Sequence, residues 1–209
     1  TTLPITLDQM IYHASSVVRA TERALVVVDL PFGSYQSDPK EALRSAIRIM
    51  KESGGHAVKL EGGREIESSI KKILNAGIPV MGHLGLTPQS VHALGGFKVQ
   101  GRGDDAERIK ADARALQKAG VFAIVLELVP TQLAKEITAE LSIPTIGIGA
   151  GVNCDAQVLV WTDMAGFTAK PPKLAKAYRN LRQELFDATK EFADEVRSGQ
   201  FPSEAQTFH

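Results

Sequence analysis

The feature that most constrains the fold is a repeating alternation of short apolar runs with longer amphipathic, charged segments. The apolar runs are rich in valine and isoleucine, and the well-marked ones lie at residues 25–29, 57–61, 78–82, 121–127 and 144–148. Short buried strands alternating with helices are typical of β/α units, in which neighbouring strands are parallel. A further segment, residues 155–167, fits either a helix or a strand.

Helices are predicted between these runs, and their start signals can be read from the sequence. Thr6 and Gln9 have capping-box spacing, whereas Asp38, Pro39 and Glu41 mark the start of a second helix. The remaining helices are expected at residues 64–75, 106–119, 132–141 and 173–198. A glycine-rich, polar stretch from 84 to 105 predicts a long loop, and loops of that length are often functional.

Composition excludes several kinds of partner. Lysine plus arginine and aspartate plus glutamate number 24 each, so no net field attracts nucleic acid or an anionic membrane. The apolar runs are far shorter than the roughly 20 residues of a membrane-spanning helix. Thr1–Met10 has no secretory signal, and Cys154 has no second cysteine to pair with. We therefore expect a soluble, cytoplasmic protein that acts on small molecules.

The expected organisation is one domain over residues 1–209, closed by a helix at 173–198 and an irregular tail at 199–209. A closed β/α barrel has eight strands, whereas five or six are expected here. Two interpretations follow: an open sheet, or a barrel whose first two β/α units are missing from this sequence. The absence of an initial methionine favours the second.

Polar side chains end four of the apolar runs, and these are the candidate site residues: Asp29, Lys59 with Glu61, His83, and Glu127. In a β/α barrel the active site lies at the carboxyl ends of the strands. Strand side chains alternate, so Lys59 and Glu61 share one face while their apolar neighbours point the other way. The same alternation turns Glu127 away from the apolar residues that precede it. Asp29 and Glu61 offer the hard oxygen ligands that magnesium takes.

Each of these residues also has an interpretation without chemistry. Asp29 could begin a turn, and Lys59 with Glu61 could be an exposed pair on an edge strand. His83 could be a hydrogen-bonded structural histidine. Glu127 is hardest to explain in this way, because an acid that ends a strongly apolar run is costly unless it has a partner or a task.

Two glycine-rich segments are open to two interpretations each. Gly147, Gly149 and Gly151 could form a backbone cradle for an anion, or they could only turn the chain tightly. The segment Gly95–Gly103, which contains two cations, could be a lid over an acidic ligand or a solvated loop.

Several longer strings resemble the ketopantoate hydroxymethyltransferase family. They match the family in order and approximate spacing, and together they span nearly the whole chain: Asp29–Phe32, Val58–Gly63, Gly82–Ser90, Gly95–Gly103 and Ile146–Gly151. The specificity lies in the middle strings rather than in any single glycine pattern.

The resemblance implies a (β/α)8 TIM barrel of the phosphoenolpyruvate/pyruvate type, in the cytoplasm, assembled as a homodecamer. It implies transfer of a hydroxymethyl group from 5,10-methylenetetrahydrofolate to 3-methyl-2-oxobutanoate, giving 2-dehydropantoate (ketopantoate) in pantothenate biosynthesis. The reaction would pass through an enolate stabilised by Mg²⁺.

By matching motifs, Asp29 and Glu61 would hold the metal, and Asp29, Lys59 and His83 would contact the oxo acid. Glu127 would accept the proton. The family's early Gly-Asp-Ser motif, with a further metal-binding aspartate, is absent from this sequence, so the metal site would be incomplete as written. The alternatives are another Mg²⁺-dependent 2-oxo acid carbon–carbon lyase of the same barrel superfamily, or a non-catalytic binding protein.

Overall fold

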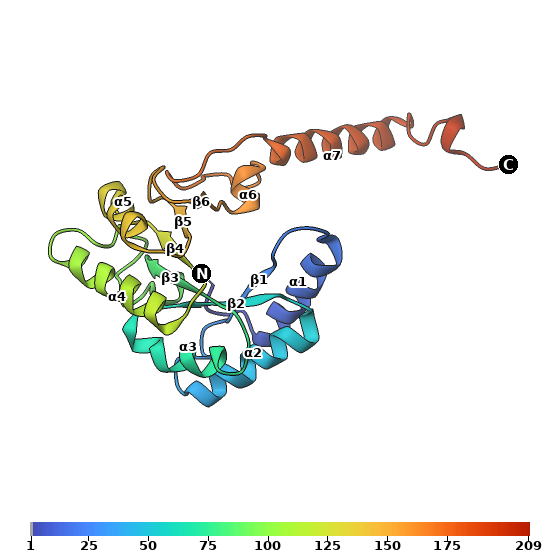
Figure 1. Cartoon of the computed structure of the whole chain (residues 1–209). Helices are drawn as coiled ribbons and strands as arrows, with labels where there is room; N and C mark the ends of the chain where they lie inside the picture. Colours follow the sequence, from blue (N-terminus) through green and yellow to red (C-terminus); the bar gives the residue numbers. More distant parts are fainter. Residues whose placement is uncertain (1) are drawn as a thin grey trace. The chain divides into compact units, whose positions relative to one another are not determined.

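The computed structural model describes residues 2–209, which divide into two compact units, residues up to Val158 and Leu159–His209 (Figure 1). The first unit holds a parallel sheet of six strands, each paired with the next one along the chain. The strands are β1 (Val27–Asp29), β2 (Ala57–Glu61), β3 (Val80–Gly85), β4 (Ala123–Glu127), β5 (Thr145–Ile148) and β6 (Ala156–Gln157). The predicted α/β fold is thus confirmed, whereas residues 2–209 do not form a closed sheet of eight strands.

Helices connect the first five strands and return the chain so that neighbouring strands run parallel. Figure 1 shows α2, α3 and α4 along the outer side of the curved sheet. The helices of this unit are α1 (Leu7–Ala20), α2 (Pro39–Ser53), α3 (Glu67–Leu74), α4 (Asp105–Ala119) and α5 (Thr131–Glu140), with 3₁₀ turns η1 (Arg64–Ile66) and η2 (Pro88–Ser90). The helix expected from residue 64 therefore begins as a 3₁₀ turn.

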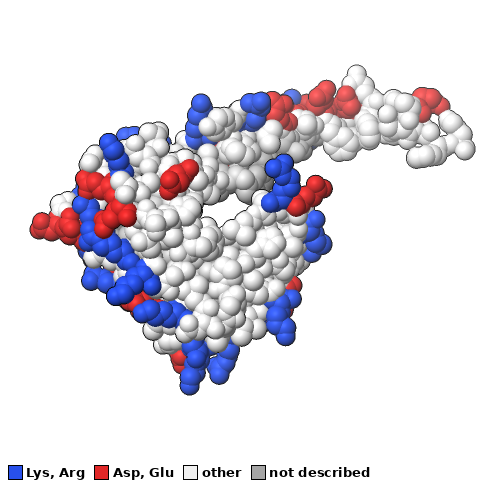
Figure 2. All heavy atoms as spheres, viewed as in Figure 1, with Lys and Arg blue, Asp and Glu red and all other residues white. Residues whose placement is uncertain are grey.

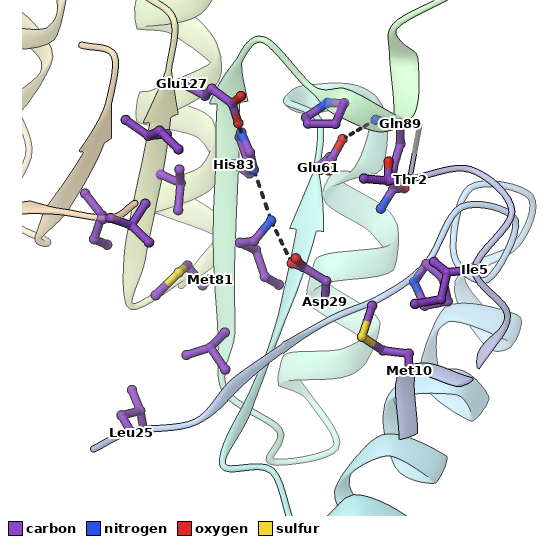
Figure 3. A pocket seen from close by; sticks show the side chains of 18 of the residues that line it. Thr2, Ile5, Met10, Leu25, Asp29, Glu61, Met81, His83, Gln89 and Glu127 are labelled. Carbon is purple, nitrogen blue, oxygen red and sulfur yellow. Dashed lines mark hydrogen bonds and ion pairs between the residues drawn. The ribbon is translucent and has the colours of Figure 1, made fainter. Parts of the chain in front are cut away.

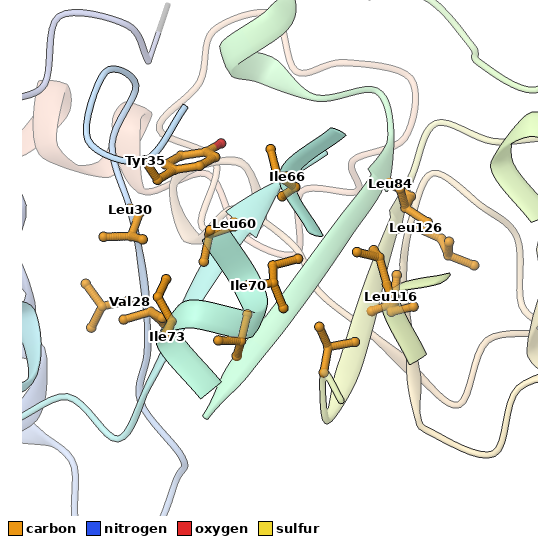
Figure 4. Close-up of a cluster of buried hydrophobic side chains, with 14 of the residues drawn as sticks. Val28, Leu30, Tyr35, Leu60, Ile66, Ile70, Ile73, Leu84, Leu116 and Leu126 are labelled. Carbon is orange, nitrogen blue, oxygen red and sulfur yellow. The ribbon is translucent and has the colours of Figure 1, made fainter. Parts of the chain in front are cut away.

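The hydrophobic core lies between the sheet and these helices (Figure 4). Val58 and Leu60 of β2 and Ile124 and Leu126 of β4 are all fully buried in it. The charged residues that alternate with them point to the other face of the sheet, as predicted. Burial of one face against helices therefore fixes which side chains are available on the opposite face.

Helix caps account for where the first two helices begin. Thr6 and Gln9 form the predicted capping box, with Gln9 N–H donating to Thr6 Oγ1 at 3.2 Å and Thr6 N–H donating to Gln9 Oε1 at 2.9 Å. Asp38 Oδ1 accepts an N–H of the first turn of α2 at 2.6 Å. Glu41 does not complete a second box, because its carboxylate accepts the Ser37 hydroxyl instead.

The second unit contains α6 (Trp161–Met164), α7 (Leu181–Ser198) and the 3₁₀ turn η3 (Glu204–Gln206). The expected helix start at residue 173 is wrong: α7 begins at Leu181, where the Asn180 side chain accepts the N–H of Gln183 at 3.3 Å. A capping asparagine thus decides the start, although the residues before it are charged. The ambiguous segment 155–167 holds both the short strand β6 and the short helix α6.

Ion pairs connect neighbouring helices on the surface of the first unit. Arg114 of α4 contacts Glu140 of α5, and Lys110 contacts Glu136 at 2.5 Å. Figure 2 shows lysine, arginine, aspartate and glutamate side chains interspersed on this face. Among the described residues, no helix is both long and apolar enough to cross a membrane.

Candidate active site

The sheet brings the predicted site residues together at the carboxyl ends of four neighbouring strands. Asp29 ends β1, Lys59 and Glu61 belong to β2, and Glu127 ends β4. The parallel register sets Asp29 beside Lys59, and Glu61 beside His83 of β3. These side chains lie close together because each strand has a polar residue at the carboxyl end of its buried run.

These residues line a cavity of about 750 Å³ (Figure 3). Its polar side carries all five predicted side chains and Gln89, whereas the remaining wall is mostly apolar. The apolar lining comes largely from the inward face of the strands and from α1: Met10, Leu25, Val27, Met81, Val125, Ile146, Ile148 and Val158. A mainly apolar cavity with a few convergent polar groups is the usual form of a small-molecule site.

A continuous series of contacts joins Asp29 to Glu127 across the four strands (Figure 3). Lys59 Nζ lies 2.6 Å from Asp29 Oδ1 and 3.0 Å from His83 Nδ1. His83 Nε2 lies 3.0 Å from the Leu86 carbonyl oxygen and 3.2 Å from Glu127 Oε2. The Lys59 side chain is only 16% exposed, which rules out the exposed edge-strand pair considered from the sequence.

The Leu86 carbonyl decides the tautomer of His83. A carbonyl oxygen can only accept, so the proton sits on Nε2, and Nδ1 accepts a hydrogen bond from the Lys59 ammonium. Burial, followed by the charge of Lys59, lowers the pKa of His83 to about 3. His83 is therefore neutral, so its 3.2 Å contact with Glu127 is not an ion pair.

Both glutamates, Glu61 and Glu127, have pKa values of about 7. Burial raises the pKa of Glu127 to about 7; Lys59 opposes this and Asp29 adds to it. Burial also raises the pKa of Glu61 to about 7, although the backbone N–H of Gln89 and the charge of Lys59 act against it. A carboxylate with a pKa near 7 can exchange protons with a substrate at neutral pH.

Two residues near the site carried no separate prediction. Gln89 donates its backbone N–H to Glu61 Oε2 at 2.8 Å, and its side chain accepts the Tyr35 hydroxyl at 2.8 Å. Gln89 lies inside the string Gly82–Ser90 quoted above, which was the one available signal. Tyr35 lies in a loop, where the sequence has no periodicity, so no sequence signal indicated it.

Asp29 and Glu61 fit two ligand positions of a divalent metal. Asp29 Oδ1 is buried, has no hydrogen-bond partner, and lies 2.6 Å from the Lys59 ammonium. The charge of Asp29 also contributes to the raised pKa of Glu61, so the two carboxyl groups lie close enough to interact. Within residues 2–209, however, no cluster of three or more histidine, cysteine, aspartate or glutamate side chains is arranged around a metal position.

The two glycine-rich segments differ in their structural surroundings. The backbone φ of Gly151 is 84°, and a Cβ there would lie 2.4 Å from Thr131, which supports the tight-turn interpretation of that string. The Gly95–Gly103 loop is anchored at one end, where Gly101 N–H donates to Asp105 Oδ2 at 2.7 Å. Neither of its cations lines the cavity, so closure over an acidic ligand stays a prediction.

Comparison with known proteins shows the family of this chain. A sequence profile described as ketopantoate hydroxymethyltransferase matches residues 1–204. The 3-methyl-2-oxobutanoate hydroxymethyltransferases of Christiangramia forsetii and Flavobacterium johnsoniae are each 61% identical over 210 residues, covering 100% of this chain and 77% of the relative.

A solved structure of phosphonopyruvate hydrolase in complex with oxalate and Mg²⁺ has a TM-score of 0.56 at 14% identity, covering 100% of this chain and 73% of that one. At that identity the likeness supports the α/β fold alone. The profile and the two relatives, by contrast, match essentially the whole length of the sequence. The chain therefore belongs to the ketopantoate hydroxymethyltransferase family.

Proposed function

We propose that the chain transfers a hydroxymethyl group from 5,10-methylenetetrahydrofolate to 3-methyl-2-oxobutanoate, yielding 2-dehydropantoate for pantothenate biosynthesis. The names of the matched relatives support the acceptor and the group transferred. The observation that carries the proposal for the site is the contact series Asp29–Lys59–His83–Glu127 along one wall of the cavity. The series combines a carboxylate whose pKa is about 7, Glu127, with a positively charged side chain that is held in place, Lys59.

Glu127 is the proton acceptor in this proposal. Carbon 3 of the oxo acid must lose its proton before it can form a bond to the folate methylene carbon. The carbon–nitrogen bonds of that methylene carbon then break, water supplies the hydroxyl oxygen, and tetrahydrofolate leaves. Glu127 lies in a poorly hydrated position, and burial keeps its pKa near 7, where a carboxylate is a stronger base than in water. The neutral ring of His83 lies beside the Glu127 carboxylate, with His83 Nε2 3.2 Å from Glu127 Oε2.

Lys59 supplies positive charge to the oxygen atoms of the oxo acid. Removal of the carbon-bound proton places negative charge on the keto oxygen, and a preorganised cation stabilises that charge most in a site that excludes water. Lys59 is held from both sides, by Asp29 at 2.6 Å and by neutral His83 at 3.0 Å. Since His83 adds no charge of its own, the ammonium remains the dominant cation there.

A magnesium ion would be held by Asp29 and Glu61 in this proposal. When bound, it would withdraw electron density from the keto group and so make the neighbouring carbon-bound proton more acidic. Carboxylate oxygens are the ligands magnesium prefers, and the ion normally keeps positions for water and substrate. Among residues 2–209, no third histidine, cysteine, aspartate or glutamate joins Asp29 and Glu61 around a metal position.

The apolar wall suits the branched end of the acceptor. Val27, Met81, Val125 and Ile146 line the same cavity as the charged groups. A volume of about 750 Å³ exceeds what a five-carbon oxo acid needs and leaves space for the reacting part of the folate.

Three broader properties belong to the same proposal. We expect the sheet to be part of a TIM barrel of the phosphoenolpyruvate/pyruvate type, the protein to act in the cytoplasm, and the assembly to be a homodecamer. The family membership and the likeness to phosphonopyruvate hydrolase support the barrel. Light scattering on the purified protein tests the decamer.

The activity is tested by carbon tracing. The protein is incubated with 3-methyl-2-oxobutanoate, Mg²⁺ and tetrahydrofolate that carries a ¹³C-labelled methylene group, and the products are followed by NMR. Label in the hydroxymethyl carbon of 2-dehydropantoate supports the transferase. Cleavage of a 2-oxo acid that needs no folate would instead support the lyase alternative.

A further inference from the structure

Tyr35 and Gln89 form a buried hydrogen-bond network that the proposed chemistry does not use. Tyr35 is 1% and Gln89 9% exposed. Gln89 Oε1 accepts the Tyr35 hydroxyl at 2.8 Å and the side-chain amide of Gln36 at 2.9 Å, while Gln89 Nε2 donates to the Leu30 carbonyl at 2.9 Å. Both ends of this buried amide are therefore satisfied.

The contacts fix the orientation of the Gln89 amide. Gly33 N–H donates to Gln36 Oε1 at 2.8 Å, which leaves the Gln36 amide nitrogen facing Gln89. A rotated Gln89 amide would set N–H against N–H there and oxygen against the Leu30 carbonyl oxygen. The network thus has one arrangement, which is a requirement for holding other groups rigidly.

The network contacts the segments that carry both metal-site carboxylates. Leu30, whose carbonyl Gln89 binds, directly follows Asp29. Glu61 is contacted at its side chain and its backbone. Its Oε2 accepts the Gln89 backbone N–H at 2.8 Å, its own N–H donates to the Tyr35 hydroxyl at 3.1 Å, and its carbonyl oxygen also lies 3.1 Å from that hydroxyl. One tyrosine and one glutamine therefore join the ends of β1 and β2 to the turn η2. Figure 3 shows Gln89 beside Glu61.

We propose that Tyr35 and Gln89 are positioning residues that set the separation and orientation of the Asp29 and Glu61 carboxylates, and so determine the affinity of the site for a divalent cation. The inference rests on the proposed function, because it takes these carboxylates as the ligands. Partners that orient metal ligands typically account for about tenfold to 100-fold in metal affinity. The expected effect is therefore on cation binding, before any reaction begins.

Two variants remove the network in different ways. Tyr35→Phe keeps the buried ring and loses only the hydroxyl, whereas Gln89→Leu loses the side-chain amide but keeps the backbone N–H bound to Glu61. Thr145→Val is the matched control. Its hydroxyl is also fully buried and bonds Thr138 at 2.8 Å and Asp155 at 3.1 Å, but it lies at the opposite end of the sheet, where β5 begins.

The experiment measures Mn²⁺ dissociation constants by electron paramagnetic resonance on the full chain, without oxo acid or folate, at a temperature where every variant is folded. Asp29→Asn and Glu61→Gln are measured alongside. We expect Tyr35→Phe and Gln89→Leu to weaken Mn²⁺ binding about tenfold or more, and Thr145→Val to leave it within twofold. If Gln89→Leu does not fold, Tyr35→Phe alone decides.

The outcomes distinguish the proposed metal site from the proposed positioning role of Tyr35 and Gln89. Weaker binding in the carboxylate variants but unchanged binding in Tyr35→Phe and Gln89→Leu overturns the positioning role and leaves the metal site intact. Unchanged binding in Asp29→Asn and Glu61→Gln overturns the metal site, and the positioning role with it. Equal weakening in Thr145→Val would mean that lost stability, not positioning, explains the effect, and would also overturn it.

Discussion

Glu127→Gln isolates the proton-accepting role of this carboxylate from its role in packing. Glutamine has nearly the same shape, so its side-chain oxygen can still face His83 Nε2, which lies 3.2 Å from Glu127 Oε2. The amide cannot accept a proton at neutral pH. General-base catalysis contributes about 10²–10⁴ in rate, equivalent to roughly 3–5 kcal/mol of barrier. We expect exchange of the carbon-3 proton of the oxo acid with solvent deuterium to slow by at least about 100-fold.

The same substitution should increase stability at high pH. The pKa of Glu127 rises from 4.5 to about 7 on folding, so the folded state binds the proton more tightly and stability falls as pH rises through that window. The loss amounts to about 3 kcal/mol above pH 7. Glu127→Gln lacks the ionising group, so urea unfolding at pH 8 should show a more stable protein, with little difference at pH 4.

The assay follows deuterium incorporation into 3-methyl-2-oxobutanoate by proton NMR in D₂O, with Mg²⁺ and without folate, so that only proton removal is observed. Glu140→Gln, at an exposed acid that ends α5 and pairs with Arg114, is the control and should exchange at the wild-type rate. Wild-type exchange in Glu127→Gln would refute the assignment of the base. Slow exchange accompanied by lost oxo-acid binding would also refute it, because Glu127 would then act in binding.

Three further predictions test the fold and the titration of the site. Leu126→Ala removes a fully buried core side chain and should lower the free energy of unfolding by about 2–5 kcal/mol, measured by urea unfolding. Thr6→Ala breaks the capping box of α1 and should cost about 1 kcal/mol in the same measurement, with no effect on exchange. Because Glu127 has a pKa of about 7 and must be ionised to accept a proton, kcat/KM should rise with pH through neutrality. A flat profile from about pH 5.5 to 8 would contradict this requirement.

The positions of the site residues could be predicted from the sequence because a parallel sheet places the ends of all its buried runs at one edge. Asp29, Glu61, His83 and Glu127 each follow or end such a run, and side-chain alternation gives the face. The start of α7 could not be predicted in the same way, since the charged residues from 173 favour a helix that the Asn180 cap delays to Leu181.

The network behind the site could not be predicted from the sequence. Tyr35 and Gln89 are 54 residues apart and lie in a loop and in the short turn η2, where no periodicity shows which side chains meet. The neutral state of His83 likewise depends on the Leu86 carbonyl and on burial, which only the folded chain provides. Local patterns therefore predicted where the charged groups would gather, but not how they are oriented.

A crystal structure of the protein with Mg²⁺ and 3-methyl-2-oxobutanoate tests the central claim most directly. It should show the oxo acid in the cavity, with its carboxylate or keto oxygen at Lys59 Nζ and carbon 3 facing the Glu127 carboxylate. An oxo acid bound elsewhere, or bound with carbon 3 turned away from Glu127, would contradict the account.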